Sequence, residues 1–108
     1  MRFDLPESIA AMRSGRKTQT RRRNVAFWLK KKYGSRITIV HQGEYLGWAR
    51  VSRVRAQRLG DMTEPEGRAE GYRSLSAFYD AWGRLYGTRD MGEMVVAISF
   101  YDVHWNKP

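Results

Sequence analysis

The clearest hydrophobic pattern in the chain lies between residues 75 and 86. Apolar side chains recur there at the three- and four-residue spacing of one helix face: Leu75, Phe78, Tyr79, Trp82, Leu85 and Tyr86. Ser74 stands where an N-cap is expected, and Gly87 follows the last apolar residue as a helix-ending glycine. The segment therefore predicts an amphipathic helix whose broad apolar stripe faces the core.

A shorter helix is predicted immediately before this one. Thr63 and Glu66 have the spacing of a capping box, in which each side chain accepts a hydrogen bond from the other residue's backbone N–H. Pro65 suits the first turn of a helix, and Glu70-Gly71 marks the expected end.

Two further helices are predicted in the N-terminal third. In the first, Asp4 is the expected cap, Gly15 follows the expected end, and one face is apolar at Leu5, Ile9 and Met12. In the second, Asn24 is the expected cap and the helix runs to about Tyr33, with Gly34 as its stop.

Strands are predicted where β-branched and aromatic residues replace the helical spacing. These segments are residues 37–41, 45–57 and 94–103, with an additional strand near 16–23. Gln42-Gly43-Glu44 is the expected turn between the first two. The 94–103 segment is apolar on both faces and is expected at the centre of the sheet. The tail 104–108 is expected to be frayed, although Trp105 is large enough to pack back.

This order of elements predicts the fold class. Short helices around a few strands do not fit a doubly wound sheet, and 108 residues suit a single domain over residues 1–108. We therefore expect an α+β protein with a small, mostly antiparallel sheet or partly closed barrel and helices packed on it.

Charge is distributed unevenly along the chain. The formal net charge is +9, and no Asp or Glu occurs between Glu7 and Glu44. That interval holds ten of the 20 Lys and Arg residues: Arg13, Arg16, Lys17, Arg21, Arg22, Arg23, Lys30, Lys31, Lys32 and Arg36. A second group follows at Arg50, Arg53, Arg55 and Arg58. This surplus favours a polyanionic partner, nucleic acid before an anionic membrane surface, over a charge run that only solvates the surface.

Several classes of protein do not fit the sequence. The chain has no cysteine, and its two histidines, His41 and His104, are too far apart for a ligand-like spacing, so neither a disulfide nor a metal site is expected. No nucleotide-cofactor or nucleophile motif is present, and no cofactor is expected. The N-terminus does not resemble a signal peptide, and no apolar run is long enough to cross a membrane, so we expect a soluble, cytoplasmic protein.

The basic stretch "RSGRKTQTRRR", residues 13–23, also contains glycine and hydroxyl residues at set places. Its central part, G-x-K-x-x-T-x-R, resembles the signature of the ASCH domain, a member of the PUA-like superfamily of small β-barrels linked to RNA. The residues that match are Gly15, Lys17, Thr20 and Arg22. Further similarity is found at Glu70-Gly71-Tyr72, Ser74-Leu75, Phe78, Leu46-Gly47, Asp61-Met62-Thr63 and residues 95–100.

The resemblance implies a PUA-like β-barrel of five to six mostly antiparallel strands, with short helices packed at its openings. It also implies a cleft beside the motif that binds RNA or a nucleotide. Some bacterial members of similar length remove the acetyl group from N4-acetylcytidine, with a Lys and a Thr of the motif and a later Glu as the catalytic set. Carried over to this sequence, these residues are Lys17, Thr20 and Glu70. Other members are described as nucleases or as binding modules.

Two functions therefore remain open. In the first, the chain is an RNA-binding module whose cations hold phosphates, while Tyr72 or Trp48 stacks a base; the phosphate contacts are Arg16, Arg21, Arg22, Arg23, Lys30 and Lys31. In the second, it is a hydrolase acting on a modified pyrimidine or on RNA. A structural ion pair between Lys17 and Glu70 is a third reading of those residues. Because a neutral nucleoside gains little from so many cations, the charge favours nucleic acid.

Overall fold

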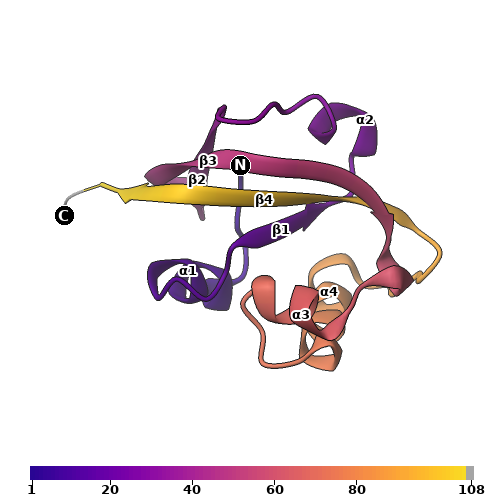
Figure 1. Cartoon of the computed structure of the whole chain (residues 1–108). Coiled ribbons are helices and arrows are strands. Elements are labelled where there is room, and N and C mark those ends of the chain that lie inside the picture. The colour runs from indigo at the N-terminus through magenta and orange to yellow at the C-terminus, as the bar shows by residue number, and fades with distance from the viewer. Residues whose placement is uncertain (107–108) are drawn as a thin grey trace.

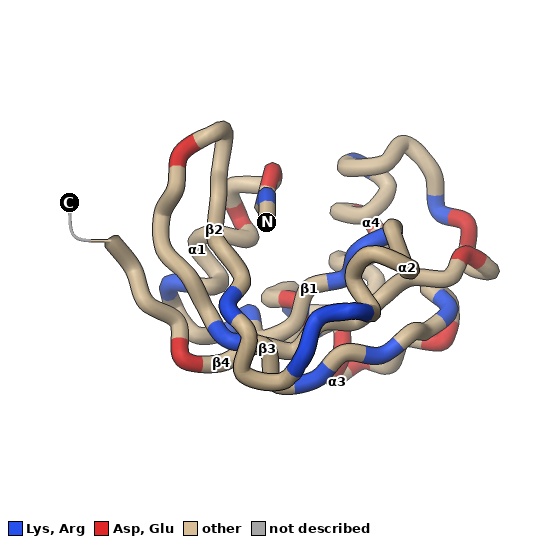
Figure 2. The backbone as a smooth tube through the Cα atoms, turned by 90° about the horizontal axis from the view of Figure 1, so that it is seen from above, with Lys and Arg blue, Asp and Glu red and all other residues tan. Residues whose placement is uncertain are grey.

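The computed structural model describes residues 1–106, in which a four-stranded antiparallel sheet forms the framework. The strands are β1 (Gln19–Arg22), β2 (Arg36–His41), β3 (Glu44–Arg58) and β4 (Met94–Trp105), in the order β1-β4-β3-β2. The sheet is curled into a half-barrel, so that β2 and α4 (Leu75–Tyr86) lie on opposite sides of the curl with β1 between them (Figure 2). The predicted α+β class is confirmed, with four strands where five to six were expected.

The position of β4 explains why its sequence is apolar on both faces. This strand pairs with β1 on one side and with β3 on the other, and its residues Val95, Val96, Ala97 and Ile98 are buried. The prediction of a central strand is therefore confirmed. The predicted turn between β2 and β3 is also confirmed, because Gln42 and Gly43 both have positive φ, as a tight hairpin of type I′ requires.

Helices cover both faces of the sheet (Figure 1). They are α1 (Pro6–Arg13), α2 (Val25–Trp28), α3 (Glu64–Ala69) and α4, with a 3₁₀ turn at Leu59–Asp61. One buried cluster includes Phe3, Met12 and the sheet residues Ile37, Ile39, Ala49, Val51, Ile98 and Phe100. A second consists of Phe78 and Trp82 of α4 packed with Leu59, Met62 and Val95. None of these helices has both the length and the apolar character needed to cross a bilayer.

The capping predictions for α3 and α4 are confirmed. The Thr63 Oγ1 accepts from the backbone N–H of Glu66, and the Glu66 carboxylate accepts from the N–H of Thr63 at 3.1 Å. Ser74 Oγ accepts from Ala77 N–H at 3.1 Å, and Gly87 adopts φ +73° at the end of α4.

The two N-terminal helices differ from their predictions. The α1 helix begins one residue later than expected, with Leu5 rather than Asp4 at the N-cap. The α2 helix is a single turn that ends before Lys30, because the following segment bonds to β3 instead. There Gly34 N–H donates to Val51 O at 2.7 Å, and Val51 N–H donates to Ser35 O at 2.9 Å. These sheet contacts override the local helix propensity of residues 29–33.

The expected fraying of the C-terminus is wrong for residues 104–106. Strand β4 continues to Trp105, which pairs with Gly47, and Asn106 N–H donates to Leu46 O at 2.9 Å. The ring of Trp105 also contacts the Arg13 guanidinium at 4.2 Å. Residues 107 and 108 of the predicted tail lie outside the described residues.

Candidate functional site

A buried ion pair joins the motif segment to the end of α3. Lys17 lies between α1 and β1, and its backbone forms an isolated antiparallel bridge with Glu70. The Lys17 Nζ lies 2.9 Å from Glu70 Oε1 and also donates to the Glu70 backbone carbonyl at 3.2 Å. Both side chains are 3% exposed. The structure therefore brings together two residues that are 53 positions apart in the sequence.

The second oxygen of Glu70 is held by Arg21. Arg21 Nη1 lies 2.8 Å from Glu70 Oε2, and its Nη2 pairs with Glu66. Its Nε and Nη2 also donate to Gln57 Oε1, at 3.2 and 2.9 Å. The side chain of Arg21, which the sequence suggested as a phosphate contact, is fully buried in these contacts.

The alternation of β1 explains why neighbouring arginines have different surroundings. Thr20 and Arg22 pair with Ile98 and Val96 of β4, whereas Arg21 pairs with Ala97. Successive side chains of a strand point to opposite faces. Thr20 and Arg22 therefore share one face of the sheet, while Arg21 extends from the other face toward α3.

Burial changes the acid–base behaviour of Lys17. Desolvation lowers the pKa of its ammonium group, and the positive charges of Arg22 and Arg21 act in the same direction. The carboxylate of Glu70 opposes this shift, but the net direction remains downward. Lys17 therefore loses its proton more readily than an exposed lysine does.

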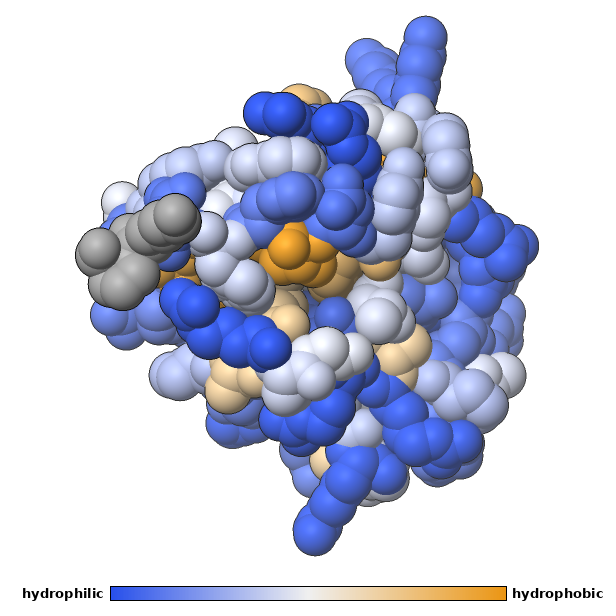
Figure 3. Space-filling model, turned by 60° about the vertical axis from the view of Figure 1, so that its left-hand side comes forward, coloured by the Kyte–Doolittle hydropathy of each residue, from blue (hydrophilic) through white to orange (hydrophobic). Residues whose placement is uncertain are grey.

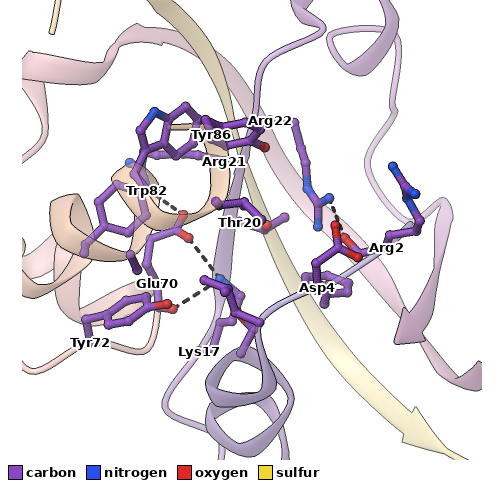
Figure 4. Close-up of a pocket in the computed structure, with 16 residues that line it drawn as sticks. Arg2, Asp4, Lys17, Thr20, Arg21, Arg22, Glu70, Tyr72, Trp82 and Tyr86 are labelled. Atoms are coloured by element: carbon purple, nitrogen blue, oxygen red, sulfur yellow. Dashed lines mark hydrogen bonds and ion pairs between the residues drawn. The ribbon is translucent and has the colours of Figure 1, made fainter. Parts of the chain in front are cut away.

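Lys17, Thr20 and Glu70 line one cavity of about 340 Å³ (Figure 4). Thr20 is buried, and its side chain points into this cavity between Lys17 and Arg22 (Figure 4). Aromatic rings form much of the wall: Phe3, Tyr72, Phe78, Trp82 and Tyr86. Four cations and two carboxylates complete the polar lining: Arg2, Lys17, Arg21, Arg22, Asp4 and Glu70.

Of the predicted base-stacking residues, only Tyr72 lines the cavity. Its hydroxyl donates to Glu7 Oε2 at 3.2 Å. Trp48 lies on β3 away from the cavity, and both faces of its ring are covered. The Arg36 guanidinium lies 3.9 Å from the ring centroid, and the His104 ring stacks at 4.1 Å. A base cannot stack on Trp48 without displacing one of these two groups.

The remaining predicted phosphate contacts do not line the cavity. Arg16 donates to Ser14 Oγ, and Arg23 pairs with Glu93. Lys30 and Lys31 follow α2, where Lys31 Nζ lies 6.0 Å from the centroid of the Trp28 ring. Figure 2 shows Lys and Arg distributed around the molecule rather than along one line. Figure 3 shows one face of the molecule, where hydrophobic residues are visible mainly in a hollow with a hydrophilic rim.

Sequence reasoning missed several residues of the cavity. Arg2 precedes α1 and had no predicted role, Asp4 was predicted only as a helix cap, and Trp82 and Tyr86 were assigned only to the core stripe of α4. Their four-residue spacing places both rings on one helix face, which was the available signal. No group of three or more His, Asp or Glu side chains within residues 1–106 is arranged to hold a metal ion.

Comparison with known proteins identifies the fold. No known family model and no curated protein sequence matches the chain. Among solved structures, the ASCH domain of Lactobacillus crispatus matches with a TM-score of 0.73 over 96% of this chain and 77% of its own, at 14% identity. The ASCH protein of Zymomonas mobilis matches with a TM-score of 0.67 over 96% of this chain and 68% of its own, at 22% identity.

A third similar structure is a DUF984 protein of Enterococcus faecalis, with a TM-score of 0.65 and 24% identity over 85% of this chain. The chain spans 63% of the length of that protein. At these identities the likeness concerns the fold. The motif of residues 15–22 predicted the same result, and the chain has the fold of the ASCH domain.

Proposed function

We propose that this protein binds RNA or another single-stranded nucleic acid and that the cavity takes one nucleotide of the strand. The single observation that carries this proposal is the cavity itself. Its volume of about 340 Å³ lies at the small end of ligand pockets, which suits one nucleotide rather than a longer segment. Unpaired bases of single strands are recognised by stacking on aromatic rings and by hydrogen bonds to their edges. Tyr72 and Tyr86 supply such rings beside the polar groups of Lys17 and Glu70.

Salt dependence tests the nucleic-acid partner. Short single-stranded RNA should lose affinity steeply as salt rises, with a log–log slope of about −0.7 for each neutralised phosphate. Fluorescence anisotropy with a labelled oligonucleotide measures this slope. An affinity that stays constant between low and moderate salt would contradict the proposal, because a partner bound through phosphates releases counterions.

Replacing Tyr72 by alanine tests whether the base enters the cavity. Loss of one stacking ring should weaken RNA binding by about 1–3 kcal/mol, or roughly 5- to 150-fold. Trp48→Ala is the matched control, because its ring lies outside the cavity between Arg36 and His104. We expect its affinity to stay close to that of the parent protein. A larger loss for Trp48→Ala than for Tyr72→Ala would place the base elsewhere.

A second candidate function is hydrolysis of an acylated pyrimidine. It is favoured by the position of Lys17, Thr20 and Glu70 around one cavity and by the lowered pKa of Lys17. In this reaction neutral Lys17 accepts the proton of Thr20 Oγ1, and the oxygen attacks the acyl carbon. The exocyclic amine leaves with the proton that Lys17 took from Thr20, and water then hydrolyses the acyl ester, which releases the acid and restores the Thr20 hydroxyl. Glu70 orients the lysine through their contact.

The hydrolase alternative predicts a specific pH profile. Release of acetate from N4-acetylcytidine should increase with pH, because the neutral form of Lys17 becomes more abundant, and should level off below the ordinary lysine value of 10.5. Thr20→Val, which keeps the side-chain shape, should abolish this release, whereas Arg58→Ala should not change it. If the parent protein gives no product at high concentration, from this substrate or from labelled RNA, the alternative is wrong.

A further inference from the structure

The side chain of Arg22 is a cation without a carboxylate partner in the described part of the chain. Lys17 and Arg21 on either side of the cavity share the carboxylate of Glu70. Arg22 instead donates from Nη1 to the backbone carbonyl of Arg2 at 2.6 Å, and its Nε is buried with no hydrogen-bond partner in residues 1–106. Its guanidinium also lies 4.7 Å from the centroid of the Phe3 ring. Arg22 therefore lines the cavity with a positive charge that no carboxylate neutralises and with an Nε–H that has no acceptor within residues 1–106.

An unpaired cation in such a place destabilises the folded protein. An arginine stays charged in proteins, so it cannot escape the penalty by losing its proton. Burial lowers the pKa of Arg22, which has the same physical origin as that penalty. An anion bound beside the guanidinium would supply both the missing charge and the acceptor for Nε.

The other charges that line the cavity do not already neutralise Arg22, so they permit an anion to bind there. Glu70 is neutralised by Lys17 and Arg21, so the lining charges that remain are Arg2, Arg22 and Asp4. The side chain of Arg2 is exposed, and its backbone carbonyl fixes Arg22. Asp4 is also exposed and takes part in no ion pair within residues 1–106, so it opposes the anion only partly. Figure 4 shows Arg2, Asp4 and Arg22 together on one side of the cavity.

We infer that Arg22, assisted by Arg2, binds a phosphate attached to the nucleoside in the cavity, so that the ligand is a nucleotide rather than a neutral nucleoside. This inference rests on the proposed function, because it assumes that a base occupies the space beside the phosphate. A guanidinium matches phosphate oxygens with two parallel N–H bonds, which an ammonium group cannot do. The phosphate belongs either to a free nucleotide or to a strand of RNA, and both present the same oxygens to Arg22.

Calorimetry with the four ribonucleosides and their 5′-monophosphates tests this site. At low salt, the best nucleotide should bind about 10- to 100-fold more tightly than its own nucleoside. Arg22→Gln should abolish this preference for the nucleotide while leaving nucleoside affinity similar. Arg2→Ala should reduce the preference without affecting the fold, because the side chain is exposed and the backbone carbonyl remains.

Two further variants test the charge dependence. Asp4→Asn should increase the preference for the nucleotide, since a repulsive charge is removed. Arg58→Ala on β3 is the matched control and should leave the preference unchanged.

The outcomes separate this inference from the proposed function. If nucleosides bind as tightly as nucleotides, or if Arg22→Gln and Arg2→Ala keep the preference, the inference is wrong, although base binding in the cavity stands. A third outcome is that neither nucleosides nor nucleotides bind but a single-stranded oligonucleotide does. If Arg22→Gln then weakens oligonucleotide binding, the phosphate that Arg22 binds belongs to the strand. If Arg22→Gln leaves oligonucleotide binding unchanged, the inference is wrong. If no ligand of any of these kinds binds, the proposed function fails and the inference fails with it.

Discussion

Glu70→Ala is expected to destabilise the protein by about 3–5 kcal/mol, because it leaves the buried Lys17 without a carboxylate and removes one of the two carboxylates that hold the buried Arg21. The Glu70 carboxylate contacts Lys17 with one oxygen and Arg21 with the other, and the side chains of all three are at most 3% exposed. Such a loss is a large part of the roughly 5–15 kcal/mol that usually separates folded from unfolded proteins. Urea unfolding followed by tryptophan fluorescence measures it, and several tryptophans are present to report it.

The same geometry predicts an unequal effect of removing the lysine. Lys17→Met should be much less destabilising than Glu70→Ala, because Glu70 keeps its contact with Arg21 and Arg21 keeps Glu66. The methionine also replaces a cation that already has a desolvation penalty. Glu44→Ala, at an exposed position of the hairpin, should change stability by no more than about 0.5 kcal/mol. Equal losses for Lys17→Met and Glu70→Ala would show that Arg21 does not hold the carboxylate as described.

Local signals in the sequence were sufficient for the elements that local interactions stabilise. The Thr63–Glu66 capping box and the apolar stripe of α4 involve residues within a few positions of one another, and both were predicted. The length of α2 was not, because it depends on hydrogen bonds between Gly34 and Val51 that only the folded sheet provides. Local helix propensity is weak compared with such tertiary contacts.

The site was predictable only in part for a similar reason. The ASCH resemblance placed Lys17, Thr20 and Glu70 together, but the sequence did not distinguish Arg21 from Arg22. Their roles depend on the pairing of β1 with β4, which turns Arg21 toward the carboxylates of Glu66 and Glu70, whereas Arg22 has no ion-pair partner within residues 1–106. A shift of one residue in that register would exchange the two side chains. Charge composition reports how many cations there are, whereas strand register decides which of them has a partner.

Gly71→Ala is expected to destabilise the protein through both backbone strain and close contacts beside the site. Gly71 follows Glu70 directly and has φ +97°, a conformation that disfavours any side chain by about 1–2 kcal/mol. An added Cβ would lie 2.6 Å from the Cβ of Ala11 and 3.1 Å from the Cβ of Lys17. Neither atom is at the end of a flexible side chain, so the helix α1 or the Lys17 segment must move, at an additional penalty of about 1–3 kcal/mol.

Two variants separate these two contributions in urea unfolding. Gly87→Ala also introduces a side chain at positive φ (+73°), but nothing lies within 4 Å of the new Cβ, so it should show the backbone strain alone. Ala11→Gly combined with Gly71→Ala removes the closer contact, and the double variant should lose less stability than the sum of the single variants. If Gly71→Ala proves no worse than Gly87→Ala, the close packing of this turn against α1 is not as described.

Because Gly71 also contacts Lys17, Gly71→Ala should weaken RNA binding at temperatures where the variant is still folded. Gly87→Ala should leave binding unchanged, since the shape of the cavity depends on the turn that seats Glu70 against Lys17.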